Sequence, residues 1–472
     1  MKRFALALVA GLTILGASSV AGALGTWSNP ATVPNITTLA PGGADIRTIA
    51  CSATGLCIGG GGYAEAGGDE HAFLTENTGS GWSNAFELPG VTAVPGLSWA
   101  MVRQISCSND GGCSLVGDYG TGGTSMSFVA TRGGGGAIDV PGLAAISTGN
   151  DTQSMGISCA SAGNCSIVGA YVDLQSHDQV FVSNQSNGSW STVQTLSGFT
   201  SPGYPTSISC GAADDCVVVG FVVGTPNAAF IVERTASGWG TPSSINTFAS
   251  DNFLNSVSCV SAAFCVAAGN VDASPSTGFA ISRIAGTWGP IDPIPNLATL
   301  AGSDPSRADS VSCWAVGKCS MTGTIGTAGN VRTWVADMDA GVWGDAQLVP
   351  GIAALGDGSV TTPKHVSCAS SGLCAIAGQY VRTGGGMLAW VSVRSGGTWS
   401  NAHPLPPVGT ATSSSYDDPD GLACSPTTCS VGGGFMDGQS APLAWLADYT
   451  DGSDPTTTTT ASSTPVTPAF TG

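Results

Sequence analysis

The first residues of this 472-residue chain that could do chemistry at close spacing are its 16 cysteines. Thiols can bind zinc, act as nucleophiles or form disulfides. Because every cysteine belongs to a closely spaced pair, no single thiol remains as a candidate nucleophile. Five residues separate the partners in seven pairs and four in the last; the pairs are Cys51/Cys57, Cys107/Cys113, Cys159/Cys165, Cys210/Cys216, Cys259/Cys265, Cys313/Cys319, Cys368/Cys374 and Cys424/Cys429.

Disulfides explain these pairs better than zinc sites do. Zinc sites usually have closer cysteine spacing and recurring histidines, and this chain has four histidines that do not cluster. An apolar stretch runs into the first cysteine of each pair, a short loop follows, and a second apolar stretch leaves the second cysteine. That pattern predicts a hairpin bridged at its mouth. We therefore favour disulfides within each repeat over bridges between repeats.

Carboxylates and amides before the cysteine strands form the second group that could do chemistry. Several of the segments that precede the first cysteine of a repeat are long and carry Asp or Asn. Their oxygen atoms could bind a calcium ion or the hydroxyl groups of a glycan. The same residue types also simply favour turns, so both interpretations stay open. The candidate ligand-binding residues are Asp151, Asp251, Asn252, Asp304, Asp417 and Asp418.

Aromatic residues in the same segments are candidates for stacking on sugars or for packing between units: Trp99, Tyr204, Phe253 and Tyr416. No catalytic motif accompanies them, since the sequence has no G-x-S-x-G elbow, no H-E-x-x-H and no P-loop. A carboxylate pair for glycoside hydrolysis stays open, because its separation in space decides that chemistry. We assign no catalytic residue and no metal ligand, and calcium is the one cofactor considered.

Composition excludes several classes of protein. Gly is frequent (69 residues), charged residues make up 9% and the formal charge is −18. The chain is too apolar to be disordered and too rich in Gly to be a helical protein. Nucleic acid and anionic membranes are poor partners, since both need a basic surface. We expect a monomer whose partner is an extracellular glycan or protein.

The elements that must position these residues recur with the cysteines, about every 50 residues. Each repeat predicts four strands: one into the first cysteine, one out of the second, an apolar strand such as "AAFIVER" (228–234), and a Trp strand after a turn such as "NGSWS" (187–191). A glycine four residues after each second cysteine indicates a bulge or a close backbone approach. These glycines are Gly61, Gly117, Gly169, Gly220, Gly269, Gly323, Gly378 and Gly433.

Eight repeats of four antiparallel strands predict an all-β fold, an eight-bladed β-propeller of four-stranded blades. Blades pack face to face, so both faces of their inner strands are buried, in agreement with apolar runs such as "VVVG" (217–220). A β-solenoid is the structural rival, but its coils are usually shorter. Two four-bladed propellers are a further alternative, which the lack of a linker between repeats disfavours.

The fragment "GTWSNPATVP" (25–34) is displaced from the repeat pattern. It resembles the end of the seventh repeat, "GTWSNAHPLP" (397–406), but no cysteine pair precedes it. The eighth repeat in turn has no Trp strand where the spacing places one, near residue 454. We therefore predict that residues 25–34 form the outer strand of the last blade, beside "APLAWLADY" (441–449), and that this pairing closes the ring. The second repeat also lacks a Trp, which predicts an irregular outer strand there.

The two ends of the chain differ from the repeats. Residues 1–23 combine a basic start, an apolar stretch and the small-residue sequence "AGA" (21–23), which predicts a signal peptide. An uncleaved membrane anchor is the alternative. Residues 24–450 form the predicted propeller, and residues 451–472 a Thr/Ser/Pro-rich disordered tail. Export predicts a secreted protein in an oxidising, extracellular or cell-surface compartment, where disulfides persist.

The repeat SVSC-x5-C-x3-G, followed by an apolar strand and GxWS, resembles secreted β-propeller repeat proteins of actinobacteria, some of which are described as sialidase-like or Asp-box-like. The resemblance covers about residues 24–450 and implies architecture rather than chemistry. A sialidase would need an arginine triad, a Tyr–Glu nucleophile pair and an acidic acid/base residue. Arg is available, but Glu is scarce, and the turns before Trp lack the S-x-D-x-G-x-T-W order of an Asp-box.

Two function classes follow from these observations. We favour a secreted, non-catalytic binding or adhesion propeller that recognises a glycan or another polar extracellular ligand. The alternative is an extracellular glycoside hydrolase, sialidase-like, or a lyase that acts at the channel mouth. In a propeller the loops from the Trp strand to the next cysteine strand emerge on one face of the ring, and both hypotheses place the site there.

Overall fold

The computed structural model describes residues 25–149, 152–245, 248–438 and 441–451. The predicted signal peptide (1–23), nearly all of the predicted tail (451–472) and the candidate residue Asp151 lie outside these ranges. Within the described ranges, no helix is long and apolar enough to cross a membrane.

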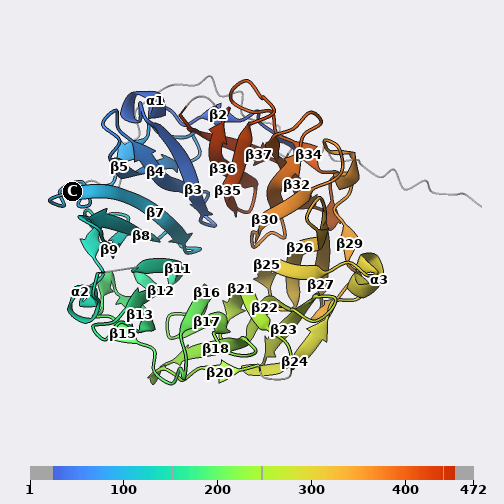
Figure 1. Ribbon diagram of the computed structural model, residues 1–472, viewed down its shortest axis with the longest axis horizontal. Helices are drawn as coiled ribbons and strands as arrows, with labels where there is room; N and C mark the ends of the chain where they lie inside the picture. Colours follow the sequence, from blue (N-terminus) through green and yellow to red (C-terminus); the bar gives the residue numbers. More distant parts are fainter. Residues whose placement is uncertain (1–24, 150–151, 246–247, 439–440, 452–472) are drawn as a thin grey trace, which may run out of the picture.

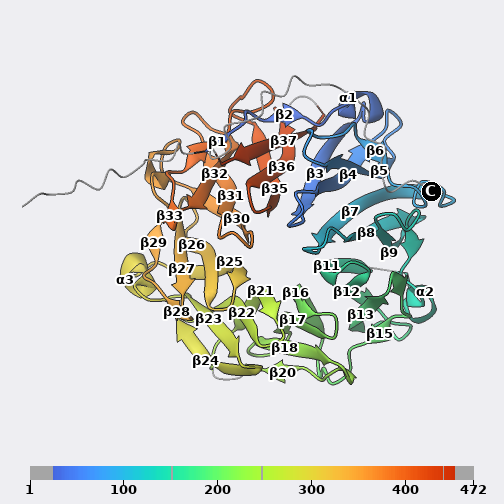
Figure 2. The same ribbon diagram turned by 180° about the vertical axis from the view of Figure 1, so that it is seen from behind.

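The chain is an all-β protein with the architecture of a β-propeller. Small antiparallel sheets stand around a common centre, and the chain passes from one sheet to the next in sequence order (Figures 1 and 2). The strand that contains the first cysteine of each repeat lies innermost (Figure 1). These inner strands are β3 (Gly43–Cys51), β7 (Leu97–Cys107), β11 (Gln153–Ser161), β16 (Gly203–Ala212), β21 (Asn252–Ser261), β25 (Ser306–Ala315), β30 (Thr361–Cys368) and β35 (Tyr416–Cys424).

The next two strands of each repeat carry most of the buried apolar residues. The second strands are β4 (Cys57–Ala64), β8 (Cys113–Thr121), β12 (Asn164–Val172), β17 (Asp215–Val222), β22 (Phe264–Val271), β26 (Lys318–Thr327), β31 (Cys374–Val381) and β36 (Thr428–Met436). The third strands are β5 (Glu70–Asn77), β9 (Thr124–Thr131), β13 (Asp178–Ser186), β18 (Ala228–Thr235), β23 (Thr277–Ile284), β27 (Asn330–Asp339), β32 (Met387–Ser395) and β37 (Leu443–Thr450).

The outermost strands are short. Repeat 2 has β10 (Ile138–Asp139) in this place and no strand that corresponds to a Trp strand, as its sequence predicts. The other outer strands are β1 (Thr26–Trp27), β2 (Ala31–Thr32), β6 (Phe86–Glu87), β14 (Ser189–Trp190), β15 (Gln194–Thr195), β19 (Gly238–Trp239), β20 (Ser243–Ser244), β24 (Thr287–Pro293), β28 (Val342–Trp343), β29 (Gln347–Leu348), β33 (Thr398–Trp399) and β34 (His403–Pro404).

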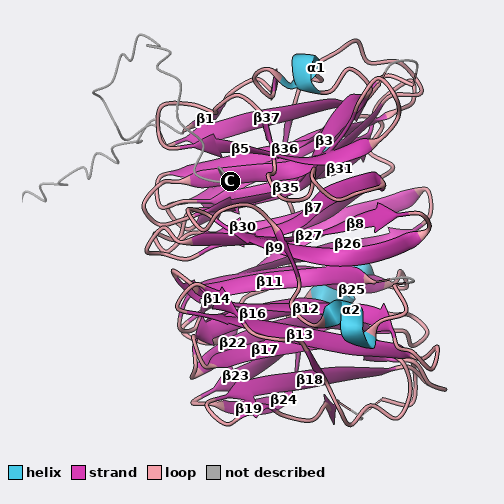
Figure 3. Cartoon of the chain, turned by 90° about the vertical axis from the view of Figure 1, so that its left-hand side faces the viewer, coloured by secondary structure: helices cyan, strands magenta, loops and turns pink. Residues whose placement is uncertain are grey.

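Helical structure is confined to single turns. Figure 3 shows α1 and α2 as short segments beside the stack of strands. Each described turn lies in the connection between an outer strand and the next inner strand: α1 (Ile36–Leu39), α2 (Leu143–Ile146), α3 (Leu297–Ala301) and the 3-10 turn η1 (Ile352–Ala354).

The described residues form seven sheets. Six sheets hold four or five strands, each from one repeat. The seventh sheet holds ten strands, which are those of repeats 7 and 8 with β1 and β2 included. A single parallel pair, Met387 with Tyr416, joins the strands of repeat 7 to those of repeat 8.

All eight cysteine pairs are disulfides within one repeat, as the spacing predicts. The two half-cystines lie directly opposite each other where the inner and second strands meet at their turn, for example Cys259 and Cys265. Each bridge closes a small hairpin loop, which the chain-entropy model values at about 2 kcal/mol. The disulfides therefore mark one common end of the inner strands.

The two half-cystines of a bridge differ in exposure. The first one lies on the inner strand and is partly exposed in six repeats, Cys313 and Cys424 being the buried exceptions. The second one lies on the strand that is covered on both faces by neighbouring sheets, so it is buried in every repeat. These buried second half-cystines are Cys57, Cys113, Cys165, Cys216, Cys265, Cys319, Cys374 and Cys429.

The start of the second strand differs slightly from the prediction. The sequence predicts a strand that leaves the second cysteine, but in five repeats the strand begins one residue earlier, so that Cys165, Cys216 and Cys429 are each its second residue. In repeat 4, Asp215 already pairs with Ala212 across the turn. The hairpin ladder therefore continues past the disulfide toward the turn.

A bulge in the inner strand explains the recurring glycine. The pairing of inner and second strands shifts register in every repeat, between Leu254 and Ser256 for example. At the shift a carbonyl oxygen of the inner strand lies where the glycine would carry a Cβ atom, 1.8 to 2.5 Å away across the eight repeats. In Gly269 the oxygen is that of Phe253, at 2.1 Å. A Cβ cannot fit at such distances, so the predicted bulge and close backbone approach are both confirmed.

At six of the eight junctions, the serine just before the first cysteine connects its inner strand to the next one. The inner strand is the edge of its sheet, so its outward N–H groups have no strand partner. In six repeats the cysteine N–H donates instead to a serine hydroxyl of the preceding repeat, over 2.9 to 3.1 Å. These serines are Ser106, Ser158, Ser209, Ser258, Ser312 and Ser367. At the other two junctions an alanine takes the place of the serine. Ala50 stands where the acceptor for the Cys107 N–H would be, and Ala423 stands where the acceptor for the Cys51 N–H would be.

A second set of contacts joins neighbouring repeats nearer their outer edge. Four Trp side chains donate their indole N–H to a third-strand residue of the preceding repeat, as Trp288 does to Glu233 at 3.0 Å. The other pairs are Trp82 with Asp448, Trp239 with Asn184 and Trp399 with Asp337. In repeat 2, which lacks the Trp, Arg132 takes this place and binds Glu76 through two hydrogen bonds of 3.2 Å.

The displaced N-terminal fragment pairs with the last strand of repeat 8. β1 and β2 are antiparallel to β37, with Trp27 opposite Tyr449 and Thr32 opposite Trp445. The backbone N–H of Val33 donates to the Ala444 carbonyl at 3.0 Å. The two segments therefore pair as predicted.

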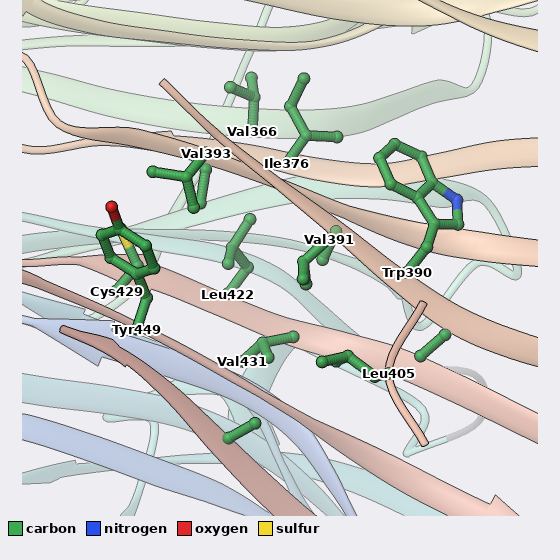
Figure 4. Close-up of a cluster of buried hydrophobic side chains, with 14 of the residues drawn as sticks. Val366, Ile376, Trp390, Val391, Val393, Leu405, Leu422, Cys429, Val431 and Tyr449 are labelled. Atoms are coloured by element: carbon green, nitrogen blue, oxygen red, sulfur yellow. The ribbon is translucent and has the colours of Figure 1, made fainter. Parts of the chain in front are cut away.

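The core lies between the sheets. Figure 4 shows part of it between repeats 7 and 8, where Val391 of β32 lies near Leu422 of β35 and Val431 of β36. Second strands are covered on both faces, and every residue of β22 is buried. This explains the apolar runs that do not alternate with polar residues.

The serine contacts generate a paired prediction. Ser258→Ala removes the acceptor of the Cys313 N–H, and we expect the free energy of unfolding to fall by about 1 kcal/mol. Ala423→Ser places a hydroxyl beside the Cys51 N–H, and we expect a gain of about 0.5 to 1 kcal/mol. Thermal and denaturant unfolding measure both changes, with Ser201→Ala, at an exposed site, as the control. Equal stability of Ser258→Ala and the control would contradict the assignment.

Candidate functional site

Each inner strand presents two side chains at its bulge, toward the end that lies away from the disulfide. The inserted residue is four positions before the first cysteine, and we call these the bulge residues: Arg47, Arg103, Met155, Thr206, Asn255, Asp309, Lys364 and Asp420. Two positions earlier are the rim residues: Asp45, Met101, Gln153, Tyr204, Phe253, Arg307, Thr362 and Asp418.

The rim and bulge residues combine exposure with chemical variety. None of these residues is fully buried, whereas the residue between them is buried in every repeat. Their types range from acidic to basic, amide and aromatic, while the disulfides and glycines around them recur without change. The constant framework therefore holds two positions per repeat at which different side chains can be presented without altering the fold.

Repeats 7, 8 and 1 bring oppositely charged rim and bulge residues together. The Lys364 ammonium lies 2.7 Å from the Asp418 carboxylate and 3.3 Å from that of Asp420. The Arg47 guanidinium lies 2.6 Å from the Asp45 carboxylate and 3.6 Å from that of Asp420. We call these five residues the charged cluster. It holds three carboxylates and two cations.

A cavity of about 380 Å³ adjoins the charged cluster. Four of its five members line the cavity, and Met101, Tyr416 and Met436 add apolar surface. The Tyr416 hydroxyl donates to the Asp418 carboxylate at 3.2 Å. The cavity can therefore offer carboxylate oxygens, a guanidinium and an aromatic ring to one polar ligand.

Burial and mutual repulsion alter the proton affinities of this cluster. Burial raises the pKa of Asp45. Burial and the nearby Asp418 raise the pKa of Asp420. Burial opposes the charged form of Lys364, but Asp418 and Asp420 outweigh it and raise the pKa of the ammonium. Desolvation and the nearby Lys364 lower the pKa of the adjacent His365 imidazole to about 4. His365 is therefore neutral at pH 7.

Asp417, a second predicted ligand residue, points away from this cavity. Its carboxylate is buried and accepts the Trp445 indole N–H at 2.7 Å. Burial raises its pKa to about 7. Its contacts thus lie within repeat 8, whereas its neighbour Asp418 lines the cavity.

The remaining predicted ligand residues are engaged in loops of other repeats. Asp251 accepts the Asn227 backbone N–H at 2.7 Å, and Asn252 is buried and accepts the Ala229 N–H at 2.8 Å. Asp304 pairs with Arg332 at 3.3 Å. The structure therefore brings Asp418, and none of these three residues, to the cavity. Their ligand-binding role stays a prediction.

The half-cystines belong to the framework and contribute nothing to the lining of this cavity. Cys165, Cys216 and Cys429 illustrate the reason, because each is at most 4% exposed. Each is also bonded to the opposite strand, to Cys159, Cys210 and Cys424 respectively. A buried sulfur atom in a disulfide offers a ligand neither surface nor a thiolate.

The sequence analysis missed four members of the charged cluster: Asp45, Arg47, Lys364 and Asp420. The signal that could have found them is their constant spacing of four or six residues before a first cysteine. The candidate residues came from the loops before the strands, whereas the bulge lies inside the inner strand.

The described residues do contain a Tyr–Glu pair of the kind that a sialidase needs. The Tyr63 hydroxyl donates to Glu87 at 2.5 Å. Burial and Glu87 raise the pKa of Tyr63, which weakens the hydroxyl as a nucleophile. The same contact recurs in repeat 2 between Tyr119 and Asp139, at 2.8 Å. Its recurrence between second and outer strands marks a framework contact.

The part of the chain that the structure describes contains no cluster of metal-ligating side chains. No group of three or more His, Cys, Asp or Glu residues there is placed to hold a metal ion. In the charged cluster, each carboxylate faces Arg47 or Lys364.

No protein-family model and no curated protein matches this sequence. Similar solved structures include a protein of unknown function from Dyadobacter fermentans, at 9% identity and a TM-score of 0.41, over 90% of this chain and 99% of the other. A subtype N11 neuraminidase-like protein of A/flat-faced bat/Peru/033/2010 matches at 12% identity and a TM-score of 0.37, over 64% and 88%. A fungal lectin from Aleuria aurantia, described as a six-bladed β-propeller, matches at 11% identity and a TM-score of 0.33, over 62% and 91%. We transfer no residue role from these proteins.

The burial of Asp417 can be tested through the pH dependence of stability. Its folded-state pKa of about 7 lies above its ordinary value of 3.8, so between these values the folded chain binds more protons than the unfolded chain. The contribution of Asp417 to the free energy of unfolding therefore falls as pH rises through this window. We expect Asp417→Asn to reduce that fall by on the order of 1 kcal/mol per pH unit, measured by denaturant titration. The surface variant Asp304→Asn is the control, and equal slopes for the two variants would contradict the assignment.

Proposed function

We propose that this chain is a secreted, eight-bladed β-propeller whose last blade is completed by residues 25–34. The pairing of β1 and β2 with β37 supports this arrangement. A single parallel residue pair links repeats 7 and 8, which otherwise form two units of five strands each. Eight disulfides favour an oxidising compartment and thus support export through a signal peptide at 1–23. In this proposal the propeller spans residues 24–450, and the tail predicted from the sequence at 451–472 lies almost entirely outside the described residues.

We further propose that the protein is a non-catalytic binding propeller for an extracellular glycan, and that the charged cluster and its cavity form part of the binding site. One observation carries this proposal. The rim and bulge residues are positions of the inner strands that are at least partly exposed in every repeat and that vary in type from repeat to repeat, within a framework that otherwise recurs. Ligand chemistry can therefore be encoded there without cost to the fold. A monomer that binds neither nucleic acid nor membrane fits the acidic charge of −18.

Binding is favoured over hydrolysis by the ion pairing of the cluster. Lys364 pairs with Asp418 and Asp420, and Arg47 pairs with Asp45 and Asp420. A general acid needs a carboxyl that holds its proton near neutral pH; burial raises the pKa of Asp45 and Asp420, but the cations beside them favour the charged form. The Tyr63–Glu87 pair lacks the lowered pKa of an activated nucleophile.

Lysine substitutions test the binding site with a matched control. Lys364 and Lys318 are the two lysines after the predicted signal peptide. Lys318 pairs with Asp339 and lies beside the Cys313–Cys319 disulfide, away from the cavity. On a glycan array and by calorimetry we expect Lys364→Met and Asp418→Asn to weaken glycan binding about tenfold or more, because the first leaves the Asp418 carboxylate without its cation and the second removes a carboxylate that lines the cavity. Lys318→Met should bind like the wild type.

Two outcomes would overturn this function. If glycan affinity is unchanged in both Lys364→Met and Asp418→Asn, the cavity is not the glycan-binding site. Turnover of sialosides or polysaccharides by the wild type, lost in Asp418→Asn or Asp420→Asn, would establish the enzymatic alternative. A calcium titration of the wild type, followed by calorimetry, tests the one cofactor considered.

Deletion of residues 25–34 tests the completed last blade. Removing β1 and β2 exposes the edge of β37 and removes the contact of Trp27 with Tyr449, whose ring centroids lie 5.7 Å apart. We expect the free energy of unfolding to fall by a few kcal/mol, since several backbone hydrogen bonds of about 1 kcal/mol each are lost together. Deletion of residues 453–472 is the control. Equal melting temperatures for both truncations would contradict the proposal.

A further inference from the structure

Three aromatic side chains meet at the inner edge of repeats 4 and 5. Tyr204 and Phe253 are rim residues, and Phe221 of β17 is the cross-strand partner of Tyr204. The Tyr204 and Phe221 rings are stacked with centroids 5.4 Å apart, and the Phe221 and Phe253 rings meet edge to face at 4.9 Å. We call these three residues the aromatic platform.

The aromatic platform is not part of the recurring framework. The other six rim residues are not aromatic. The counterparts of Phe221 in the other repeats are also not aromatic: Gly62, Asp118, Ala170, Asn270, Thr324, Gln379 and Gly434. All three rings are partly exposed, Tyr204 at 37%, and none belongs to a buried apolar cluster of the described residues. The fold therefore does not require these rings.

Polar groups hold the platform in place and flank it. The Tyr204 hydroxyl donates to the Asp178 carboxylate of the preceding repeat at 3.1 Å. Beside Phe253, the Asn255 amide donates to Asn270 at 3.0 Å and to the Ala308 carbonyl at 2.9 Å. Flat apolar faces with hydroxyl, amide and carboxylate groups at their margins match a ligand that is apolar on one face and rich in hydroxyl groups at its edge.

We propose that the aromatic platform is a second subsite, which stacks the C–H face of a neutral sugar ring of the glycan. The face of an aromatic ring carries partial negative charge and attracts the partially positive C–H groups of a pyranose ring. This inference rests on the proposed glycan-binding function and adds a ligand class to it. The cavity at the charged cluster includes none of the three rings.

The platform lies across the ring from that cavity. In Figure 1, β16 and β21 are on the opposite side of the ring from β3 and β35. Both sites use rim residues, so both are at the same end of the inner strands. The charged cluster and the platform thus offer two different chemistries, one for polar or charged groups and one for neutral sugar rings.

Leucine substitutions remove the aromatic faces while they keep apolar bulk. The probes are three neutral polysaccharides, a β-glucan, a xylan and a galactomannan, tested by affinity electrophoresis and calorimetry on the full chain. We expect wild-type protein to bind at least one probe, and Tyr204→Leu and Phe253→Leu each to weaken that binding about tenfold. Tyr204→Phe should retain most of the affinity, because it keeps the ring. Trp314→Leu, at a partly exposed aromatic residue beside the Cys313–Cys319 disulfide, should bind like the wild type.

The outcomes separate this inference from the proposed function. If Lys364→Met weakens glycan binding and Tyr204→Leu and Phe253→Leu do not, the platform is refuted and the proposed function stands. Binding of acidic glycans alone refutes the neutral-sugar subsite in the same way. If the wild type binds no glycan, both proposals fail. Circular dichroism and the melting temperature of each single variant verify that loss of binding does not reflect loss of folding.

Discussion

The hydrogen bond from a cysteine N–H to the serine hydroxyl of the preceding repeat is the contact on which the arrangement of repeats depends. The inner strand of each sheet is an edge, and its unpaired N–H groups would otherwise face the centre of the ring. The Ser258 hydroxyl accepts the N–H of Cys313, and five further serines each accept the cysteine N–H of the repeat that follows their own. The disulfide fixes the same cysteine to the second strand, so each repeat is anchored both within itself and to its neighbour.

The bulge and its glycine convert this framework into a scaffold for recognition. Because a carbonyl oxygen occupies the space of a Cβ, the glycine cannot change, and the inner strand must bulge at the same place in every repeat. The rim and bulge side chains are therefore presented in equivalent positions whatever their type. Acidic and basic residues gather in repeats 7, 8 and 1, and aromatic residues in repeats 4 and 5. One backbone geometry thus supports two chemically different surfaces.

Sequence reasoning succeeded where the determining interactions are local. The spacing of Cys259 and Cys265 predicted a bridged hairpin, and the constant position of Gly269 predicted the bulge. The match between 25–34 and the end of repeat 7 predicted the pairing with β37. It was less informative about Asp251 and Asn252, since the same carboxylate and amide groups that suggest a ligand also accept backbone N–H groups of the preceding repeat, those of Asn227 and Ala229.

What the sequence by itself determined is the repeating unit: its strands, its disulfides, its glycine and the N-terminal fragment that pairs with the last strand of repeat 8. Each follows from residues within one repeat or from counting between repeats. Only the tertiary structure decided which side chains meet across repeats, because those contacts join residues about 50 positions apart or at opposite ends of the chain. Lys364 and Asp418 become neighbours in this way, as do Asp420 and Arg47. Their charges interact only after neighbouring sheets have packed, and spacing along the chain does not reveal that geometry.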